Sequence, residues 1–179
     1  MTLSTLAILV GLVYSMPSFF VLAKPDSCRE FARKFPRSEP CGWVLMLLAT
    51  AWMLYYLRLE SNSDIAKMKP FLTVLFVALG LGACVFLRDF LAVRGLAVVL
   101  LLAAKLVLDT QRWHDSPWRL VLAVMAYAWI FAGMWLTISP WRLRDMIEWV
   151  TETDERLRCV AGARVAGGLL LMILGFTQF

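Results

Sequence analysis

The sequence predicts an all-helical integral membrane protein with about six transmembrane helices and one amphipathic interfacial helix. Of its 179 residues, 61% are apolar and only 17% are charged, and the mean hydropathy is +0.72. A soluble domain has about 45–50% apolar and about 25% charged residues. Six helices of about 20 residues, each able to cross the hydrocarbon, would leave about 60 residues for connections. We therefore expect a single membrane domain over residues 1–179, with no room for a soluble catalytic domain.

The apolar residues fall into long runs, and we interpret each run as a helix because only helices satisfy their own backbone in lipid. The predicted spans are residues 3–23, 43–60, 71–87, 90–108, 118–138 and 159–176. The first is expected to be a permanent span, because a secretory signal begins with basic residues and here no Lys or Arg precedes Lys24. We expect a kink in this span near Pro17. Residues 61–70 are expected to form a polar turn.

Arg88 and Asp89 alone separate the third and fourth spans. An uninterrupted helix over residues 71–108 would be about 57 Å long, nearly twice the hydrocarbon thickness. The sequence therefore predicts a tight hairpin here, although the turn could extend to Gly95. Ser116 and Pro117 are typical of the cap and first turn of the fifth span.

Residues 141–158 are too charged to cross a membrane, yet their apolar side chains recur at roughly helical spacing. This pattern indicates an amphipathic helix in the membrane interface, and Trp141 and Trp149 support that position. The helix could be continuous or broken near Thr153. The alternative is a soluble connecting helix packed on the protein itself.

The distribution of Lys and Arg predicts the orientation. The first, third and fifth connections with their flanking residues hold twelve Lys and Arg, against six on the other side. The side with twelve should be cytoplasmic, which places both termini outside. Cytoplasmic loops facing anionic lipid also explain the net charge of +5, so no nucleic-acid partner is needed.

The four cysteines test this orientation. Cys28 and Cys41 flank the first connection, and we expect free thiols there because a disulfide requires an oxidising compartment. A bridge between them is the alternative. Cys84 and Cys159 are expected to be small apolar packing residues.

The search for catalytic or cofactor chemistry is negative. The only histidine, His114, excludes a bis-His haem or a multi-His metal site within one chain, and it is interpreted as a capping or interfacial residue. Gly80 and Gly82 lack the rest of a phosphate-binding loop. We expect no enzyme activity, no cofactor and no metal.

Charges in or beside the spans are the main functional candidates. Arg94 and Lys105 share one helix face, but each lies close enough to a helix end to extend to water. Lys105 can pair with Asp109 one turn away. We interpret these charges as structural anchors, with a substrate or proton path as the alternative. The candidate intramembrane charges are Arg88, Asp89, Arg94, Lys105 and Asp109.

Two further sets of residues are candidates for contacts. Basic and aromatic residues near the interface are expected to contact anionic lipid or a partner: Arg29, Arg33, Lys34, Trp141, Arg142, Arg144 and Trp149. Small residues four apart let helices approach closely: Ala78 with Gly82, Gly162 with Ala166, and Ala163 with Gly167. Packing within the chain is the simpler interpretation of these pairs, and association with another subunit is the alternative.

Residues 139–175 combine a Pro and a Trp-containing basic stretch, an Asp before a Leu-Arg pair, and Gly-rich apolar residues: Pro140, Trp141, Arg144, Met146, Ile147, Asp154, Leu157, Arg158, Gly162, Gly167 and Gly168. This pattern resembles a family of very small bacterial inner-membrane proteins of unknown function, in which two helices flank an amphipathic connection. The chain has Thr153 and Asp154 where the family has a Pro-Asp pair, and four further helices precede the segment. The resemblance implies a bacterial inner membrane and carries over no activity.

Two hypotheses from different classes follow. The first is a non-catalytic accessory, assembly or scaffold subunit that acts through contacts with lipid and other membrane subunits. The second is a small oligomeric transporter or channel for an anion or lipid headgroup. The direction of the face that bears Arg94 and Lys105, toward lipid or toward a shared wet cavity, discriminates between them.

Overall fold

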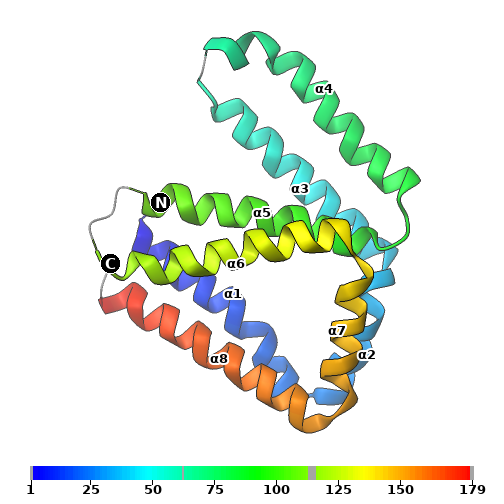
Figure 1. Cartoon of the computed structure of the whole chain (residues 1–179), viewed down its shortest axis with the longest axis vertical. Coiled ribbons are helices and arrows are strands. Elements are labelled where there is room, and N and C mark those ends of the chain that lie inside the picture. Colours follow the sequence, from blue (N-terminus) through cyan, green and yellow to red (C-terminus); the bar gives the residue numbers. More distant parts are fainter. Residues whose placement is uncertain (1, 62, 113–115, 178–179) are drawn as a thin grey trace. The chain divides into compact units, whose positions relative to one another are not determined.

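A computed structural model describes residues 2–61, 63–112 and 116–177, and these residues are helical apart from short connections (Figure 1). The helices are α1 (Leu3–Ala23), α2 (Pro25–Lys34), a 3-10 turn η1 (Phe35–Arg37), α3 (Glu39–Leu59), α4 (Ser63–Phe86), α5 (Leu91–Gln111), α6 (Arg119–Ile138), α7 (Trp141–Glu152) and α8 (Asp154–Thr177). Six of them, α1, α3, α4, α5, α6 and α8, are long and apolar enough to cross a membrane. The predicted all-helical class with six candidate spans is confirmed.

Two predicted boundaries on the N-terminal side are wrong. The polar turn expected at residues 61–70 is instead the start of α4, which begins at Ser63 and continues through Pro70. Strong helix formers such as Lys67 and Met68 precede this proline, and the one hydrogen bond it removes does not end the helix. The second span begins at Glu39 rather than residue 43, with Pro40 in the first turn, where a missing N–H costs nothing.

Helix α2 is the element that the sequence interpretation missed. No helix was predicted between the first and second spans, where Arg29, Arg33 and Lys34 were expected to contact anionic lipid or a partner, but Pro25–Lys34 is helical. Pro25 opens the helix, Asp26 lies in its first turn, and Arg33 and Lys34 lie in its last turn. This charge order complements the helix dipole at both ends.

The turn between the third and fourth spans lies where it was predicted. Helix α4 ends at Phe86 and α5 begins at Leu91. Phe90 has a φ of 57°, a left-handed conformation that is uncommon for a residue other than glycine. The turn does not extend to Gly95, which lies within α5 against Leu45 of α3.

The predicted interfacial helix over residues 141–158 is two elements. Helix α7 ends at Glu152, the chain bends at Thr153, and α8 begins at Asp154, five residues before the expected sixth span. Asp154 and Glu155 in the first turn of α8 favour a new helix N-terminus at this point. The break near Thr153 is confirmed, whereas residues 154–158 belong to α8.

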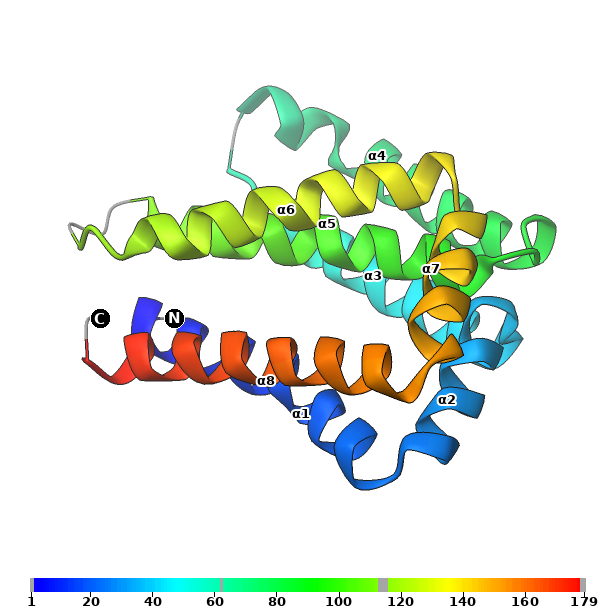
Figure 2. The same cartoon turned by 60° about the horizontal axis from the view of Figure 1, so that its bottom comes forward.

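The chain forms two compact units. The first comprises Met1–Lys34, Ala103–Trp129 and Arg144–Phe179, and the second comprises Phe35–Leu102 and Ile130–Leu143. In the first unit, α1 and α8 lie side by side and antiparallel in both views (Figures 1 and 2). In the second unit, α3 packs on α4, and Gly42 and Gly95 let α3 and α5 approach closely.

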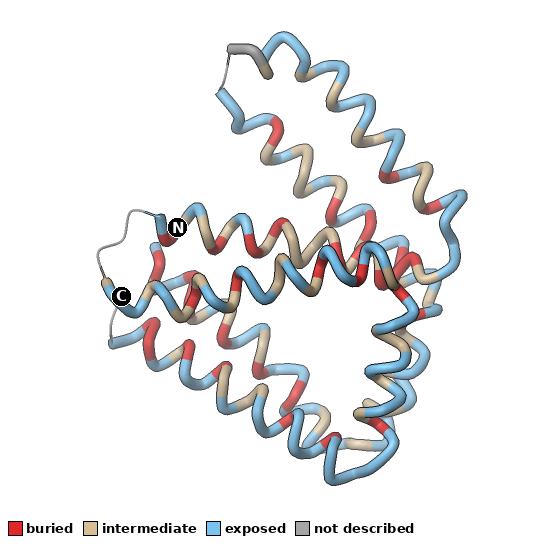
Figure 3. The backbone as a smooth tube through the Cα atoms, viewed as in Figure 1, coloured by how far each residue is buried: buried red, intermediate tan, exposed pale blue. Residues whose placement is uncertain are grey.

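Small residues occupy the helix contacts, and many large apolar side chains face outward. Buried positions form narrow stripes along the spans (Figure 3), such as Gly11, Ser15 and Ser18 on α1. Large apolar residues are exposed on the opposite faces, up to 85% for Phe86. Outward-facing hydrophobic side chains on long apolar helices are the arrangement expected where lipid replaces water as the solvent.

Candidate functional site

The first candidate site is a polar junction where α2 meets the end of α7 and the start of α8. Arg33 of α2 donates from Nε to the Thr151 hydroxyl at 2.9 Å and from Nη2 to the Thr151 carbonyl at 3.1 Å. Thr151 is 2% exposed, and its hydroxyl also donates to the Ile147 carbonyl at 2.7 Å. The Thr151 carbonyl belongs to the last turn of α7, where carbonyls lack partners within the helix. Arg33 therefore caps the C-terminus of α7 from another helix.

Arg29, one turn before Arg33, forms an ion pair with Asp154, the first residue of α8. Arg29 and Arg33 lie on one face of α2 because they are four residues apart. The two arginines thus hold both sides of the break at Thr153. We call this set of contacts, made by Arg29 and Arg33 with Thr151 and Asp154, the α2 bridge.

Lys34 and Glu30 lie elsewhere on α2 and form a local pair, with Lys34 Nζ 2.5 Å from Glu30 Oε1. The hydrogen bond and positive charge of Lys34 lower the pKa of the Glu30 carboxyl below its ordinary value. Lys34 was expected to contact lipid with Arg29 and Arg33, but the structure separates them. The two arginines contact the protein, and Lys34 remains exposed.

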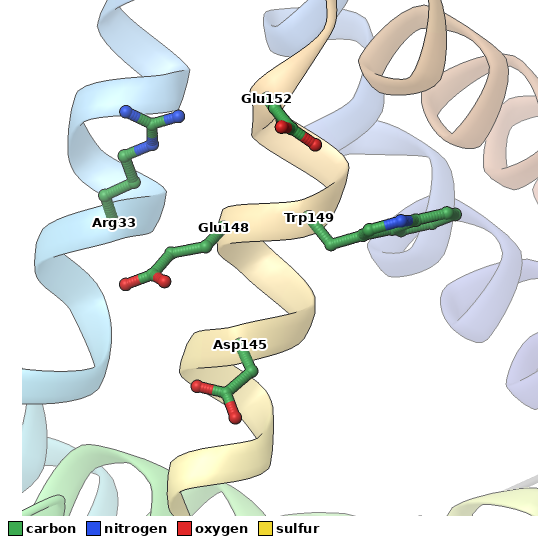
Figure 4. Close-up of a pocket in the computed structure, with 5 residues that line it drawn as sticks. All are labelled: Arg33, Asp145, Glu148, Trp149 and Glu152. Atoms are coloured by element: carbon green, nitrogen blue, oxygen red, sulfur yellow. The ribbon is translucent and has the colours of Figure 1, made fainter.

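An open groove of about 560 Å³ lies beside the bridge, lined by Arg33, Asp145, Glu148, Trp149 and Glu152. Glu148 points toward α2, whereas Trp149 projects from the other side of α7 (Figure 4). Within the described residues, no group of three or more His, Cys, Asp or Glu side chains is placed to hold a metal ion.

Three large apolar side chains on the two helices α2 and α7 are exposed. Phe31 on α2 is 64% exposed and Trp149 on α7 is 59% exposed, and Met146 is exposed on the same helix. The Arg156 guanidinium lies over the Trp149 ring, 4.9 Å from its centre. We call Phe31, Met146 and Trp149 the apolar platform. Such residues at the ends of spans are typical of contacts with an interface or a partner.

The other predicted interface residues lie on α7. Trp141 is exposed at the start of the helix, and Arg142 follows it. Arg144 pairs with Asp145 at 2.9 Å and with Glu148 at 3.7 Å along its own helix. The charge of Arg144 is thus partly neutralised locally, which leaves Trp141 and Arg142 as the more available contacts.

A second candidate site lies between α1 and α8. The Arg164 guanidinium lies over the Tyr14 ring, with its central carbon 5.0 Å from the ring centre. Arg164 was counted with the loop charges of the cytoplasmic side, but it lies within α8, well past the charged start of that helix. Its Nε is buried and has no hydrogen-bond partner among the residues that the structure describes. The sequence indicated that Arg164 lies within a span, because it is the sixth residue of the apolar run that begins at Cys159.

The five predicted intramembrane charges separate into different environments. Arg88 and Asp89 are exposed in the turn between α4 and α5. Lys105 pairs with Asp109 at 2.6 Å, and both side chains are about half exposed, as expected for an anchor near a helix end. Arg94 is partly buried, and its Nε has no hydrogen-bond partner within the described part of the chain.

The small-residue pairs singled out in the sequence are not the main helix contacts within either unit. A Cβ on Gly82 or Gly162 would meet open space, and Ala78, Ala163 and Ala166 are exposed. Gly167 alone touches a neighbouring helix, where its added Cβ would lie 3.6 Å from the Tyr14 ring. Packing within the chain, the simpler interpretation, is therefore wrong for Gly82 and Gly162.

The residues that bring α1 and α8 together are instead Gly11, Gly168 and Gly175. A Cβ on any of them would lie less than 3 Å from the opposite helix. Ser4 adds a hydrogen bond from its hydroxyl to the Gly175 carbonyl at 2.7 Å. Gly168 and Gly175 are seven residues apart, which keeps them on one helix face. The predicted small-residue pairs are four residues apart and therefore do not include these two glycines.

The structure records all four cysteines as free thiols. Cys84 is fully buried beside Met46 and Leu91, as expected of a small packing residue. Cys159 is exposed, so the same expectation is wrong for it. His114 lies outside the described residues.

In comparisons with known proteins, the chain matches no family model, no curated protein and no solved structure. The likeness of residues 139–175 to small inner-membrane proteins stays an expectation from the sequence. The polar junction and the charges of the spans are therefore the features that bear on the function of this chain.

Proposed function

We propose that this chain is a non-catalytic accessory, assembly or scaffold subunit of a larger complex in the bacterial inner membrane. The observation that carries the proposal is the α2 bridge, which fixes two short charged helices to the start of a transmembrane helix. A platform that presents Phe31 and Trp149 needs this rigidity, because side chains held in place lose less entropy when a partner binds.

The environment of the charges on α5 also supports this proposal over a transport path. Lys105 is neutralised by Asp109 on its own helix and is half exposed. A residue that lines a wet path for anions would keep its positive charge available for the passing ion. Arg94 lies in the first turn of α5, close enough to the helix end to extend toward headgroups.

We place the α2 bridge on the cytoplasmic side as part of the same proposal. Moving Arg164 from the loops into α8 lowers the count of basic residues on this side from twelve to eleven, against six on the other. The positive-inside rule still favours the same orientation. Antiparallel α1 and α8 bring Ser4 to Gly175, which fits two termini on one side of the membrane.

The alternative is a small oligomeric transporter or channel for an anion. Two observations favour it: the Nε atoms of Arg94 and Arg164 are buried without a hydrogen-bond partner among the described residues. A path between protomers could use such guanidinium groups to attract an anion.

The test is purification of the tagged chain from its own membranes in a gentle detergent, followed by native mass spectrometry. We expect a defined set of different subunits in fixed ratio. The double variant Phe31→Ala/Trp149→Ala should lower their yield about 10-fold, as loss of aromatic anchors does at other interfaces. Phe86→Ala, which removes an exposed aromatic residue away from the platform, is the matched control and should have no effect.

A different result would favour the transporter. A complex that contains only copies of this chain, together with anion flux in liposomes that Arg94→Gln/Lys105→Gln abolishes, would overturn the accessory role. Retention of all subunits by both the platform variant and the control would show that the platform does not make the contact.

A further inference from the structure

Arg164 is a positive charge held near the middle of two transmembrane helices. Its partner in the cation–π contact, Tyr14, lies close to the centre of α1 (Leu3–Ala23). The Tyr14 ring also lies beside Gly167 on α8, where an added Cβ would be 3.6 Å from the ring. The ring therefore holds the guanidinium beside the apolar part of α8 rather than among the charged residues at its start.

The contact with Tyr14 does not neutralise this charge. The ring attracts the cation but carries no net charge, and the ion pairs of the described residues do not include Arg164. Among the described residues its Nε is buried without a hydrogen-bond partner. Charged side chains in hydrocarbon are costly and are normally paired, so a carboxylate or an equivalent anion at this depth would stabilise the guanidinium.

This chain does not contain such a carboxylate. Within the six apolar spans, acidic residues occur only in the first or last turns: Glu39, Asp109, Asp154 and Glu155. A second copy of the chain has the same residues and lacks a mid-span carboxylate for the same reason. Lipid phosphates lie at the membrane boundary and not at the centre of a span.

We infer that Arg164 is the docking point for a transmembrane helix of a different protein, one that carries an Asp or Glu near the middle of its span. This inference rests on the proposed accessory role and names the chemistry of one partner. The guanidinium donates two hydrogen bonds to the carboxylate. The two helices and the Tyr14 ring shield the resulting ion pair from lipid.

The surface beside Arg164 suits the close approach of such a helix. Successive residues are about 100° apart around a helix, so Ala163 and Gly167 both lie on the same side of Arg164. Ala163 is exposed, whereas Gly167 already lies against the Tyr14 ring of α1. The small side chain of Ala163 lets a partner backbone come close enough for a short charged side chain to reach Arg164.

The test compares Arg164→Gln with Arg164→Lys in the tagged full-length chain, purified from its own membranes. Loss of the charge should lower the yield of one membrane subunit about 10-fold, which corresponds to about 1.4 kcal/mol, while the lysine variant should retain that subunit. Arg158→Gln removes a charge at the start of the same helix and is the matched control. The retained subunit should have an Asp or Glu in the middle of a predicted span.

A chemical cross-link identifies the contact directly. The membrane-permeant reagent dicyclohexylcarbodiimide activates a buried carboxyl group, and the amine introduced by Arg164→Lys can then form an amide with it. Peptide mass spectrometry should place this amide between position 164 and the partner's mid-span Asp or Glu. It should not form in the wild-type chain, whose guanidinium is not an effective nucleophile for this reaction.

The outcomes separate this inference from the proposed function. If other subunits co-purify but Arg164→Gln keeps all of them and no amide forms at position 164, the docking inference is wrong and the accessory role stands. If only copies of this chain are found, both are wrong. A variant that lowers subunit yield must still elute as a single peak with the thermal stability of Arg158→Gln, so that misfolding is not mistaken for loss of docking.

Discussion

Gly11 of α1 and Gly168 of α8 face each other so closely that neither has room for a side chain. A Cβ on Gly11 would lie 2.6 Å from the Gly168 carbonyl oxygen, and a Cβ on Gly168 would lie 2.7 Å from that of Gly11. Both obstacles are backbone atoms, which cannot rotate away. The antiparallel pair of α1 and α8, and with it the position of Tyr14 beside Arg164, depends on these two glycines.

We therefore expect Gly168→Ala to loosen this pair and to lower the free energy of unfolding by about 1–3 kcal/mol, the usual cost of overpacking. The measurement is thermal unfolding in detergent. Gly162→Ala is the control on the same helix, because its Cβ meets open space and alanine favours helix. Equal stability of the two variants would show that α1 and α8 are not in tight contact.

The α2 bridge can be tested with Arg33 and Thr151. Arg33→Ala and Thr151→Val each remove one side of the hydrogen bond at 2.9 Å. Since the donor is charged and the acceptor is buried, we expect a coupling energy of about 1–3 kcal/mol in a double-mutant cycle measured by unfolding. Arg33→Lys should recover only part of the stability lost in Arg33→Ala, because lysine lacks the planar guanidinium that donates to the hydroxyl and the carbonyl at once. Strictly additive effects would mean that the two residues act separately.

Lys105 and Asp109 should behave as a surface anchor. Replacing them together by Gln and Asn removes an exposed pair, so we expect a change of at most about 1 kcal/mol in stability. Subunit composition after gentle extraction should be unchanged. A loss of subunits in this variant, with normal thermal stability, would give the pair a role in assembly.

The cysteines provide a test of orientation. In variants that retain only Cys28 or only Cys159, we expect a membrane-impermeant maleimide to label inside-out vesicles and to spare intact spheroplasts, because both residues lie on the proposed cytoplasmic side. Permeabilised spheroplasts provide the control for reactivity. Labelling of intact spheroplasts would reverse the proposed topology and place both termini in the cytoplasm.

Hydropathy was sufficient to predict the class of fold, because the membrane imposes one rule on every span. Each run long enough to cross must be helical, and α1 was predicted residue for residue while α5 and α6 were predicted to within three residues. The errors lie where polar sequence is helical. Helix α2 and the first turns of α4 and α8 are charged and still helical, so the bounds of an apolar run do not mark every helical residue.

The candidate site could be predicted only in part. Arg29 and Arg33 were selected as contacts, but the sequence pattern could not show that their partners are Thr151 and Asp154, more than a hundred residues away. Arg164 was counted with the charges that flank the fifth connection, although the predicted sixth span, residues 159–176, contains it. Its contact with Tyr14 depends on the register of α1 against α8, which Gly11, Gly168 and Gly175 set.

The sequence by itself determined the helical class of this protein and the number of its helices that are apolar enough to cross a membrane, because both depend mainly on composition along each run. Only the tertiary structure decided which charges are paired within the chain and which are not. Lys105 and Lys34 find a partner one turn away on the same helix, whereas Arg29 and Arg33 need α2 to lie against the break between α7 and α8. Pairing at a distance is set by helix packing, and packing depends on contacts between residues far apart in the chain.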